Sequence, residues 1–151
     1  MEPVFTVTKR SSEYWSMKVP EFHGEFEILF PLSGSGHIFI DKGVYPLQRG
    51  NLFVMDAATP HRSLAKGQGN YTRCALHFPQ ETLEELGICD LPELLAEKGN
   101  CIALEEGDCL LCESLFGELL LPDDLMKENS ILMKTRDALI SAIGYDKFAV
   151  I

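Results

Sequence analysis

The chain has 151 residues, of which 46% are hydrophobic and 24% are charged, an ordinary globular composition. A chain of this length buries about two thirds of its unfolded surface, so we expect one folded domain with a real core rather than a disordered protein. No apolar run reaches the roughly 18 residues that a membrane span needs, and the N-terminus lacks the basic-then-apolar pattern of a secretion signal.

Charge is distributed unevenly along the chain. Residues 1–80 hold 8 basic and 7 acidic side chains, whereas residues 81–151 hold 5 basic and 16 acidic ones. A domain that grips nucleic acid usually presents a basic face, and phosphates are repelled by an acidic one. We therefore expect a cytoplasmic protein that binds neither a membrane nor, by itself, DNA or RNA.

Up to residue 80 the chain is predicted to be mainly β, because short β-like runs alternate with turns rich in Gly, Asp and Asn. The runs are FEILF (26–30), GHIFI (36–40), VYPLQ (44–48), NLFVM (51–55) and YTRCALHF (71–78). Their spacing of roughly 8–12 residues favours an all-β sandwich or barrel.

The run 71–78 has two chemically different faces. Arg73 and His77 fall on one face, and the apolar side chains alternate onto the other. If the apolar face meets the hydrophobic layer, Arg73 and His77 face solvent or a cavity. Arg73 can then bind a carboxylate ligand or pair with Glu27, and both alternatives stay open. We expect Arg62 to point outward and His37 to lie on the surface.

After residue 80 the apolar spacing becomes helical. Residues 79–87 and 90–99 predict two short helices, and 100–106 one more strand in the barrel or at its edge. Residues 107–121 predict a longer helix that Pro122 ends, and about 125–143 predict its antiparallel partner. We thus expect a barrel over 1–106, with the short helices at about 80–98, and a helical hairpin over 107–145. The residues predicted to form a dimer surface are Leu125, Leu132, Met133, Leu139 and Ile140.

The five cysteines are predicted to be free thiols, because their number is odd and no export signal precedes them. Cys109 and Cys112 have the C-x-x-C spacing of redox and zinc sites. They lie in an apolar helical pattern with no second Cys or His pair nearby, so we favour packing in the core.

A cluster of His and Glu residues lies before the first apolar run. Glu21 and His23 are two residues apart, so on a strand they face the same way, and Glu27 follows four residues later. A second segment runs from Gly50 to His61. Together they resemble the two motifs of the cupin superfamily, H-x-H-(x)3–4-E-(x)6-G and G-(x)5-P-x-G-x-x-H. The chain departs from them in having Glu21 for the first His and in lacking the Pro and the Gly of the second motif.

The stretch HGEFEILFPLSGSGHIFIDKGVYPLQRGNLFVMDAATPHRS (23–63) more closely resembles the N-terminal sensor domain of AraC-type transcription regulators. The strand 71–78 and the two C-terminal helices also fit that layout, so the likeness covers about residues 5–145. It implies a cupin jelly-roll β-barrel with a C-terminal α-helical hairpin, a small effector bound in the barrel, and a homodimer formed through the helices.

On this resemblance, a sugar or similar metabolite is the expected effector, and the chain is not an enzyme. A barrel mouth with His and carboxylate groups can hydrogen-bond hydroxyls. Trp15 either covers an apolar face of the ligand or packs at the rim. The expected ligand-binding residues are Glu21, His23, Glu27, His61, Arg73, His77 and Trp15.

Two other interpretations stay open. In metal-binding cupins the matching positions hold the metal, and here these are Glu21, His23, Glu27 and His61, which suit Fe(II), Mn or Zn. The chain would then be a small metal-dependent isomerase or dioxygenase, although the lead interpretation needs no cofactor. The second alternative is a stand-alone metabolite-binding cupin.

The AraC-type family carries a basic helix-turn-helix half after the sensor, and DNA is bound only through that half. No such half fits before Ile151. We therefore expect a sensor domain cut from a longer regulator or, alternatively, a natural stand-alone sensor.

Overall fold

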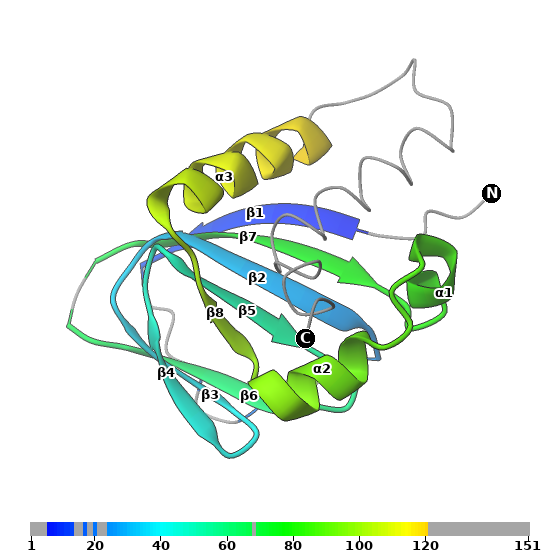
Figure 1. Cartoon of the computed structure of the whole chain (residues 1–151). Coiled ribbons are helices and arrows are strands. Elements are labelled where there is room, and N and C mark those ends of the chain that lie inside the picture. Colours follow the sequence, from blue (N-terminus) through cyan, green and yellow to red (C-terminus); the bar gives the residue numbers. More distant parts are fainter. Residues whose placement is uncertain (1–5, 14–16, 18–19, 21–23, 68, 121–151) are drawn as a thin grey trace.

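A computed structural model describes residues 6–13, 17, 20, 24–67 and 69–120 of the chain. Within these residues the chain is mainly β, as predicted, with strands followed by helices (Figure 1). The strands are β1 (Thr6–Ser12), β2 (Phe26–Ser33), β3 (Gly36–Ile40), β4 (Gly43–Leu47), β5 (Asn51–Met55), β6 (His61–Ala65), β7 (Tyr71–Phe78) and β8 (Cys101–Ala103). The helices are α1 (Thr82–Leu86), α2 (Leu91–Lys98) and α3 (Glu106–Leu120).

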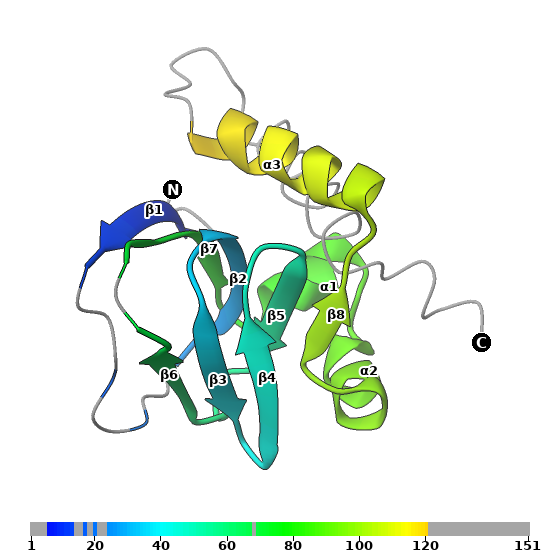
Figure 2. The ribbon, with the colours of Figure 1, turned by 90° about the vertical axis from the view of Figure 1, so that its left-hand side faces the viewer.

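The strands form two antiparallel sheets that face each other (Figure 2). One sheet has the order β1-β7-β2-β5-β8, and the other has the order β4-β3-β6. The pairing of β1 with β7 runs from Thr6 opposite His77 to Ser12 opposite Tyr71. Among the described strands no ladder joins the two sheets, so the jelly-roll barrel is open rather than closed.

An apolar layer separates the outer face of the five-stranded sheet from the helices. Alternate residues of β2, β5 and β7 point into this layer, and α1, α2 and α3 cover it. The rings of Phe30 and Phe116 stack at 5.5 Å, which fixes α3 on the sheet. The buried members of the layer are Phe26, Ile28, Phe30, Leu52, Val54, Cys74, Leu76, Phe78, Leu83, Ile88, Leu91, Leu95, Cys109, Cys112 and Phe116.

The C-x-x-C pair belongs to this layer, which confirms its predicted role in the core. Cys109 and Cys112 are buried free thiols on the inner side of α3. Burial raises the pKa of Cys112 to about 12, which keeps its sulfur protonated and unreactive.

Arg49, in the turn between β4 and β5, ties the barrel to α3. Its Nε donates to Glu113 Oε1 at 3.0 Å, and both of its terminal nitrogens donate to the Glu106 carboxylate at 3.1 Å. These contacts raise the pKa of Arg49 and lower the pKa of Glu106. We call Arg49, Glu106 and Glu113 the α3 clasp.

Two strands were not predicted. The sequence of β1, TVTKRSS, has no apolar alternation, and its strand is defined by pairing with β7, more than 60 residues away. The strand β6 starts directly after Pro60, in a segment interpreted only as the end of a motif. The short strand β8 lies at a sheet edge beside β5, one of the two positions expected for it.

The second helix of the predicted hairpin, with Leu125, Leu132, Met133, Leu139 and Ile140, lies outside the described residues. None of the helices that the structure describes combines the length and apolarity needed to cross a bilayer.

Candidate functional site: a cavity between the sheets

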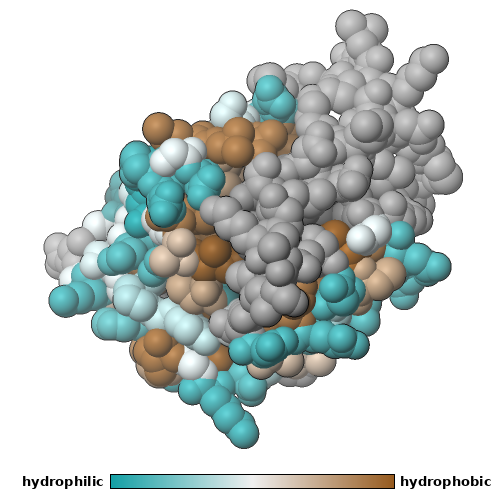
Figure 3. Space-filling model, in the orientation of Figure 1, coloured by the Kyte–Doolittle hydropathy of each residue, from teal (hydrophilic) through white to brown (hydrophobic). Residues whose placement is uncertain are grey.

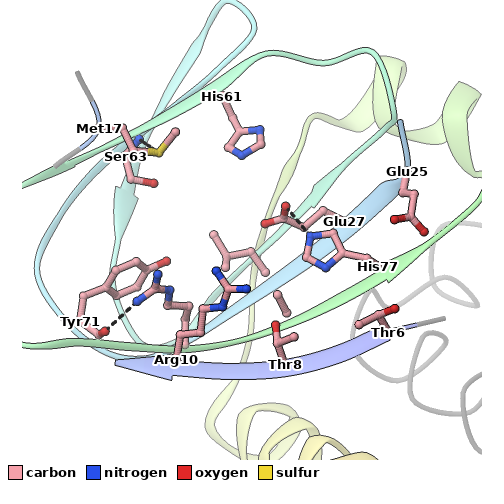
Figure 4. A pocket seen from close by; sticks show the side chains of 13 residues that line it. Thr6, Thr8, Arg10, Met17, Glu25, Glu27, His61, Ser63, Tyr71 and His77 are labelled. Carbon is pink, nitrogen blue, oxygen red and sulfur yellow. Dashed lines mark hydrogen bonds and ion pairs between the residues drawn. The ribbon is translucent and has the colours of Figure 1, made fainter. Parts of the chain in front are cut away.

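A cavity of about 550 Å³ lies between the two sheets (Figure 4). This volume is within the range of roughly 300–1,000 Å³ that is usual for small-molecule sites. Its lining mixes charged, hydroxyl and apolar side chains. The lining residues are Thr6, Thr8, Arg10, Met17, Glu25, Glu27, Leu29, His61, Ser63, Tyr71, Arg73, Ala75 and His77.

Strand alternation supplies most of these side chains. The inner face of β7 presents every second residue, from Tyr71 to His77, and the even-numbered residues of β1 lie beside them. Among the other residues of β7, Cys74, Leu76 and Phe78 belong to the apolar layer under the helices. Arg73 and His77 therefore face the cavity, which was one of the two positions expected for them.

Glu27 and His77 form a pair at one end of the cavity. They are directly opposite on β2 and β7, and the Glu27 carboxylate lies 2.9 Å from His77 Nε2. The side chains are only 10% and 24% exposed, respectively. The hydrogen bond from Glu27 raises the pKa of His77 above its ordinary value of 6.5, against the opposing effect of burial. This end of the cavity can therefore hold a proton on the imidazole near neutral pH and accept or donate hydrogen bonds.

Two arginines and a tyrosine form the other end. Arg73 Nη1 donates to Ser12 Oγ at 2.9 Å and to the Tyr71 carbonyl at 3.2 Å, and the guanidinium lies 4.6 Å above the Tyr71 ring. Arg10 stands directly opposite Arg73 on β1. Burial raises the pKa of the Tyr71 hydroxyl, so it stays protonated. Figure 4 shows Tyr71 at one end of the cavity and the Glu27–His77 pair at the other. The charge of Arg10 is near enough to His77 to lower its pKa, against the larger effect of Glu27.

The three-stranded sheet contributes His61 and Ser63, which alternate inward on β6. The Met17 backbone N–H donates to the Ser63 carbonyl at 2.8 Å, and the Ser63 N–H contacts the Met17 sulfur at 3.3 Å, so Met17 is held at the cavity wall. Arg62 lies off the cavity lining and donates to the Met17 carbonyl at 2.7 Å.

The turn before His61 replaces the Pro and Gly of the cupin motif with side-chain hydrogen bonding. Asp56 Oδ1 accepts from the Ala58 N–H at 3.1 Å and from the Thr59 hydroxyl at 2.6 Å. An aspartate that bonds two and three residues ahead fixes a turn without glycine. His61 thus begins β6 at a defined place on the cavity wall.

Of the residues predicted to bind a ligand, Glu27, His61, Arg73 and His77 lie on the cavity. The other three, Glu21, His23 and Trp15, lie outside the described residues. Glu27 is paired with His77, and the contacts of Arg73 within the described chain are with Ser12 and Tyr71.

Sequence reasoning missed several lining residues. Period-two alternation from Arg73 and His77 was sufficient to identify Tyr71 and Ala75. No local signal marked those on β1, because that strand was not predicted. The missed residues are Thr6, Thr8, Arg10, Met17, Glu25, Leu29, Ser63, Tyr71 and Ala75.

The metal set implied by the cupin motif is only half represented in the described chain. Glu27 and His61 are on the cavity, while Glu21 and His23 are outside the described residues. Within residues that the structure describes, no three or more His, Cys, Asp or Glu side chains come together as metal ligands.

Comparison with solved structures finds the same overall fold in ToxT from Vibrio cholerae. One ToxT structure is 8% identical with a TM-score of 0.59, and covers 96% of this chain and 58% of its own. The ligand-free structure of a ToxT variant from strain SCE256 is 12% identical with a TM-score of 0.62, and covers 98% and 58%. A cupin protein from Bacteroides fragilis is 20% identical with a TM-score of 0.45, over 52% of this chain and 68% of its own.

The chain therefore spans a little over half the length of the ToxT chains that it matches. A search of curated proteins gave no match. The model of one protein family, described as the AraC-like ligand binding domain, matches residues 2–118. Since that match covers most of the chain and agrees with the fold, the protein belongs to the family of AraC-like ligand binding domains.

Proposed function

We propose that this chain is the effector-sensing and dimerisation domain of an AraC-type transcription regulator, and that a small polar metabolite, such as a sugar, binds between its two sheets. The observation that carries the proposal is the cavity of about 550 Å³ with hydrogen-bonding groups at both ends. The charged groups of the cavity belong to neither of the two buried apolar clusters of the fold. The proposal assigns no reaction to the cavity.

The proposed mechanism is linkage between the cavity and the helices. An effector that binds one arrangement of strands and helices more tightly shifts the population toward it. The strand β1 lines the cavity and also contacts α3, so it is one physical route between them. The α3 clasp at Arg49 is another contact that such a shift would rearrange. In the cytoplasm, DNA would be bound through a separate helix-turn-helix half.

Dimerisation is proposed to use the C-terminal helices. On α3, Leu110 and Leu111 are 53% and 45% exposed, and Figure 3 shows hydrophobic residues gathered along this helix. The predicted stripe of Leu125, Leu132, Met133, Leu139 and Ile140 would extend this surface. Exposed apolar patches of this kind are typical of association surfaces.

A thermal-shift screen of sugars and small acids tests effector binding. A true effector raises the melting temperature, because a ligand that binds only the folded state stabilises it by an amount that grows with concentration. We expect His61→Ala to weaken the effect and His37→Ala to preserve it, since His37 is exposed on β3, away from the cavity. An equal loss of the ligand-induced rise in melting temperature in both variants would contradict binding in the cavity.

Analytical ultracentrifugation tests the dimer. We expect a dimer for the wild type, and monomers with an intact barrel when Leu132 and Leu139 are replaced by glutamate. A wild-type chain that sediments as a monomer at high concentration would contradict this part of the proposal while leaving effector binding intact.

A further inference from the structure

We propose that the effector is an organic acid whose carboxylate binds between Arg10 and Arg73, at the β1 edge of the cavity. This inference rests on the proposed function, because it names the chemical class of ligand for the same cavity. It rests on the register of β1 against β7 and on the hydrogen-bonding state of the two arginines.

Two positively charged side chains enter the cavity from opposite positions of one strand pair. Arg10 and Arg73 are direct partners in the antiparallel ladder of β1 and β7, and both line the cavity. Like charges directly opposite on one face of a sheet destabilise it. A bound anion reverses the sign of this effect, since it turns a repelling pair into two attractive contacts.

The donors of these arginines are available. Arg73 contacts Ser12 and the Tyr71 carbonyl through Nη1 alone, which leaves Nε and Nη2 without a partner in the described chain. Those two nitrogens form the edge of a guanidinium that binds a carboxylate in a bidentate manner. Within the described residues, the Arg10 guanidinium takes part in no hydrogen bond or ion pair.

In the described chain, the hydrogen-bond partners of the cavity's acidic residues are not the arginines. Glu27 contacts His77, and Glu25 is an exposed residue beyond this pair, at the end of the cavity far from Tyr71 (Figure 4). Among the described residues, neither arginine forms a hydrogen bond or an ion pair with a carboxylate, although Arg10 is near enough to His77 to lower its pKa.

The surroundings favour an organic acid over an inorganic anion. The ring of Tyr71 and the side chains of Leu29 and Ala75 line the cavity beside the arginines and offer apolar contact to a carbon skeleton. Ser63 and the Glu27–His77 pair offer hydrogen bonds to hydroxyls further in. A sugar acid or an aromatic acid therefore satisfies more of the cavity than phosphate does.

The test compares acids with their own amides, which have nearly the same shape but no charge. The probes are glucuronate against glucuronamide and phenylacetate against phenylacetamide, with inorganic phosphate as a further arm. Calorimetry and thermal shift are measured on the full chain. We expect at least one acid to bind about tenfold or more tightly than its amide, as expected for losing a charge-assisted hydrogen bond.

Three single-charge variants locate the effect. Arg10→Gln and Arg73→Gln should abolish the preference for the acid. Lys9→Gln removes the same charge from the neighbouring position of β1, which is on the other face, and should preserve it. Without ligand, Arg10→Gln should raise the melting temperature by about 1–3 °C, because the repulsion across the ladder is lost.

Each outcome has a distinct meaning. If an amide or a neutral sugar binds as tightly as the acids, or if the arginine variants keep the preference, the carboxylate inference is wrong and the proposed function stands. If phosphate binds as well as the acids, the site is a general anion site and the organic-acid inference fails. If neither these probes nor any compound of the wider screen binds the wild type, the proposed function fails together with it.

Discussion

The two faces of the five-stranded sheet are built from the same strands but have opposite chemistry. The outer face packs against the helices, with Leu76 and Phe78 of the sheet and Phe116 of α3 in one buried cluster. No member of that cluster is charged. The inner face carries Glu27, His77 and the two arginines around a cavity. It also packs Phe53 and Met55 against the second sheet, in a smaller buried apolar cluster. Adjacent residues of one strand therefore lie in different surroundings, the apolar layer under the helices on one side and a partly charged cavity on the other.

This separation lets the inner face tolerate charge. The buried apolar area on the outer face, at about 25 cal/mol per Å², supplies favourable free energy that does not depend on what the cavity contains. The inner face can then hold an opposed pair of arginines, which by itself destabilises the sheet. Substitutions on the two faces should therefore change stability by different amounts and with a different dependence on pH.

The largest effect is expected on the outer face. Phe116→Ala removes a ring that is stacked on Phe30 and 2% exposed, and should lower the free energy of unfolding by about 3–5 kcal/mol. Urea denaturation measures it. The matched control is Glu118→Ala at an exposed position of α3, expected to change stability by no more than about 0.5 kcal/mol. Similar losses in both variants would mean that α3 is not anchored by its inner side.

An intermediate effect that depends on pH is expected on the inner face. Because the folded-state pKa of His77 is raised above 6.5, the stabilisation from the Glu27–His77 pair is fully present below pH 6.5 and is lost as the pH rises through the raised pKa. Glu27→Gln should therefore reduce stability by about 1.5–3 kcal/mol below pH 6.5, and by less at higher pH.

The measurement is urea denaturation at a series of pH values. His77→Gln should flatten the same part of the plot of unfolding free energy against pH. The double variant should lose no more stability than the sum of the losses in the two single variants. A Glu27→Gln profile that runs parallel to the wild type would show that the pair does not control this pH dependence.

The smallest effect is expected at the α3 clasp, which joins the barrel rim to the helix without belonging to either face. Arg49→Gln removes three hydrogen bonds at an exposed site, so global stability should change little, since exposed ion pairs contribute little. Amide hydrogen exchange over residues 106–113 should become faster. Arg49→Lys should give nearly the same result, because an ammonium group cannot reproduce the forked geometry. Unchanged exchange in Arg49→Gln would show that the clasp does not hold the helix.

The parts of the fold that were predicted correctly are those with a local pattern. The apolar runs identified β2, β3, β4, β5 and β7, and helical spacing identified α1, α2 and α3. Arg73 and His77 were assigned to a common face by alternation alone. The strand β1 was missed because most of its side chains on both faces are polar, so its sequence shows no apolar alternation. Its pairing with β7 defines it as a strand.

The candidate site depends more strongly on register than the fold does. Pairing of Glu27 with Arg73 was one expectation from the sequence, yet in the structure His77 is opposite Glu27. Nothing local to either strand determines which of the two β7 residues meets the carboxylate. Arg10 was missed for the same reason, since its position opposite Arg73 is a property of two distant segments.

The pairing of β1 with β7 also has a consequence for synthesis. A ribosome releases residues 6–12 long before residues 71–77, so the edge strand that carries Arg10 has no partner while the intervening segment is made. Closing a loop of this length is among the slower contributions to folding. The small sheet of β3, β4 and β6 can form earlier, because its partners are adjacent or nearly adjacent in sequence. The cavity is therefore completed only after most of the barrel has emerged, and nascent chains shorter than about residue 78 should not bind the proposed effector.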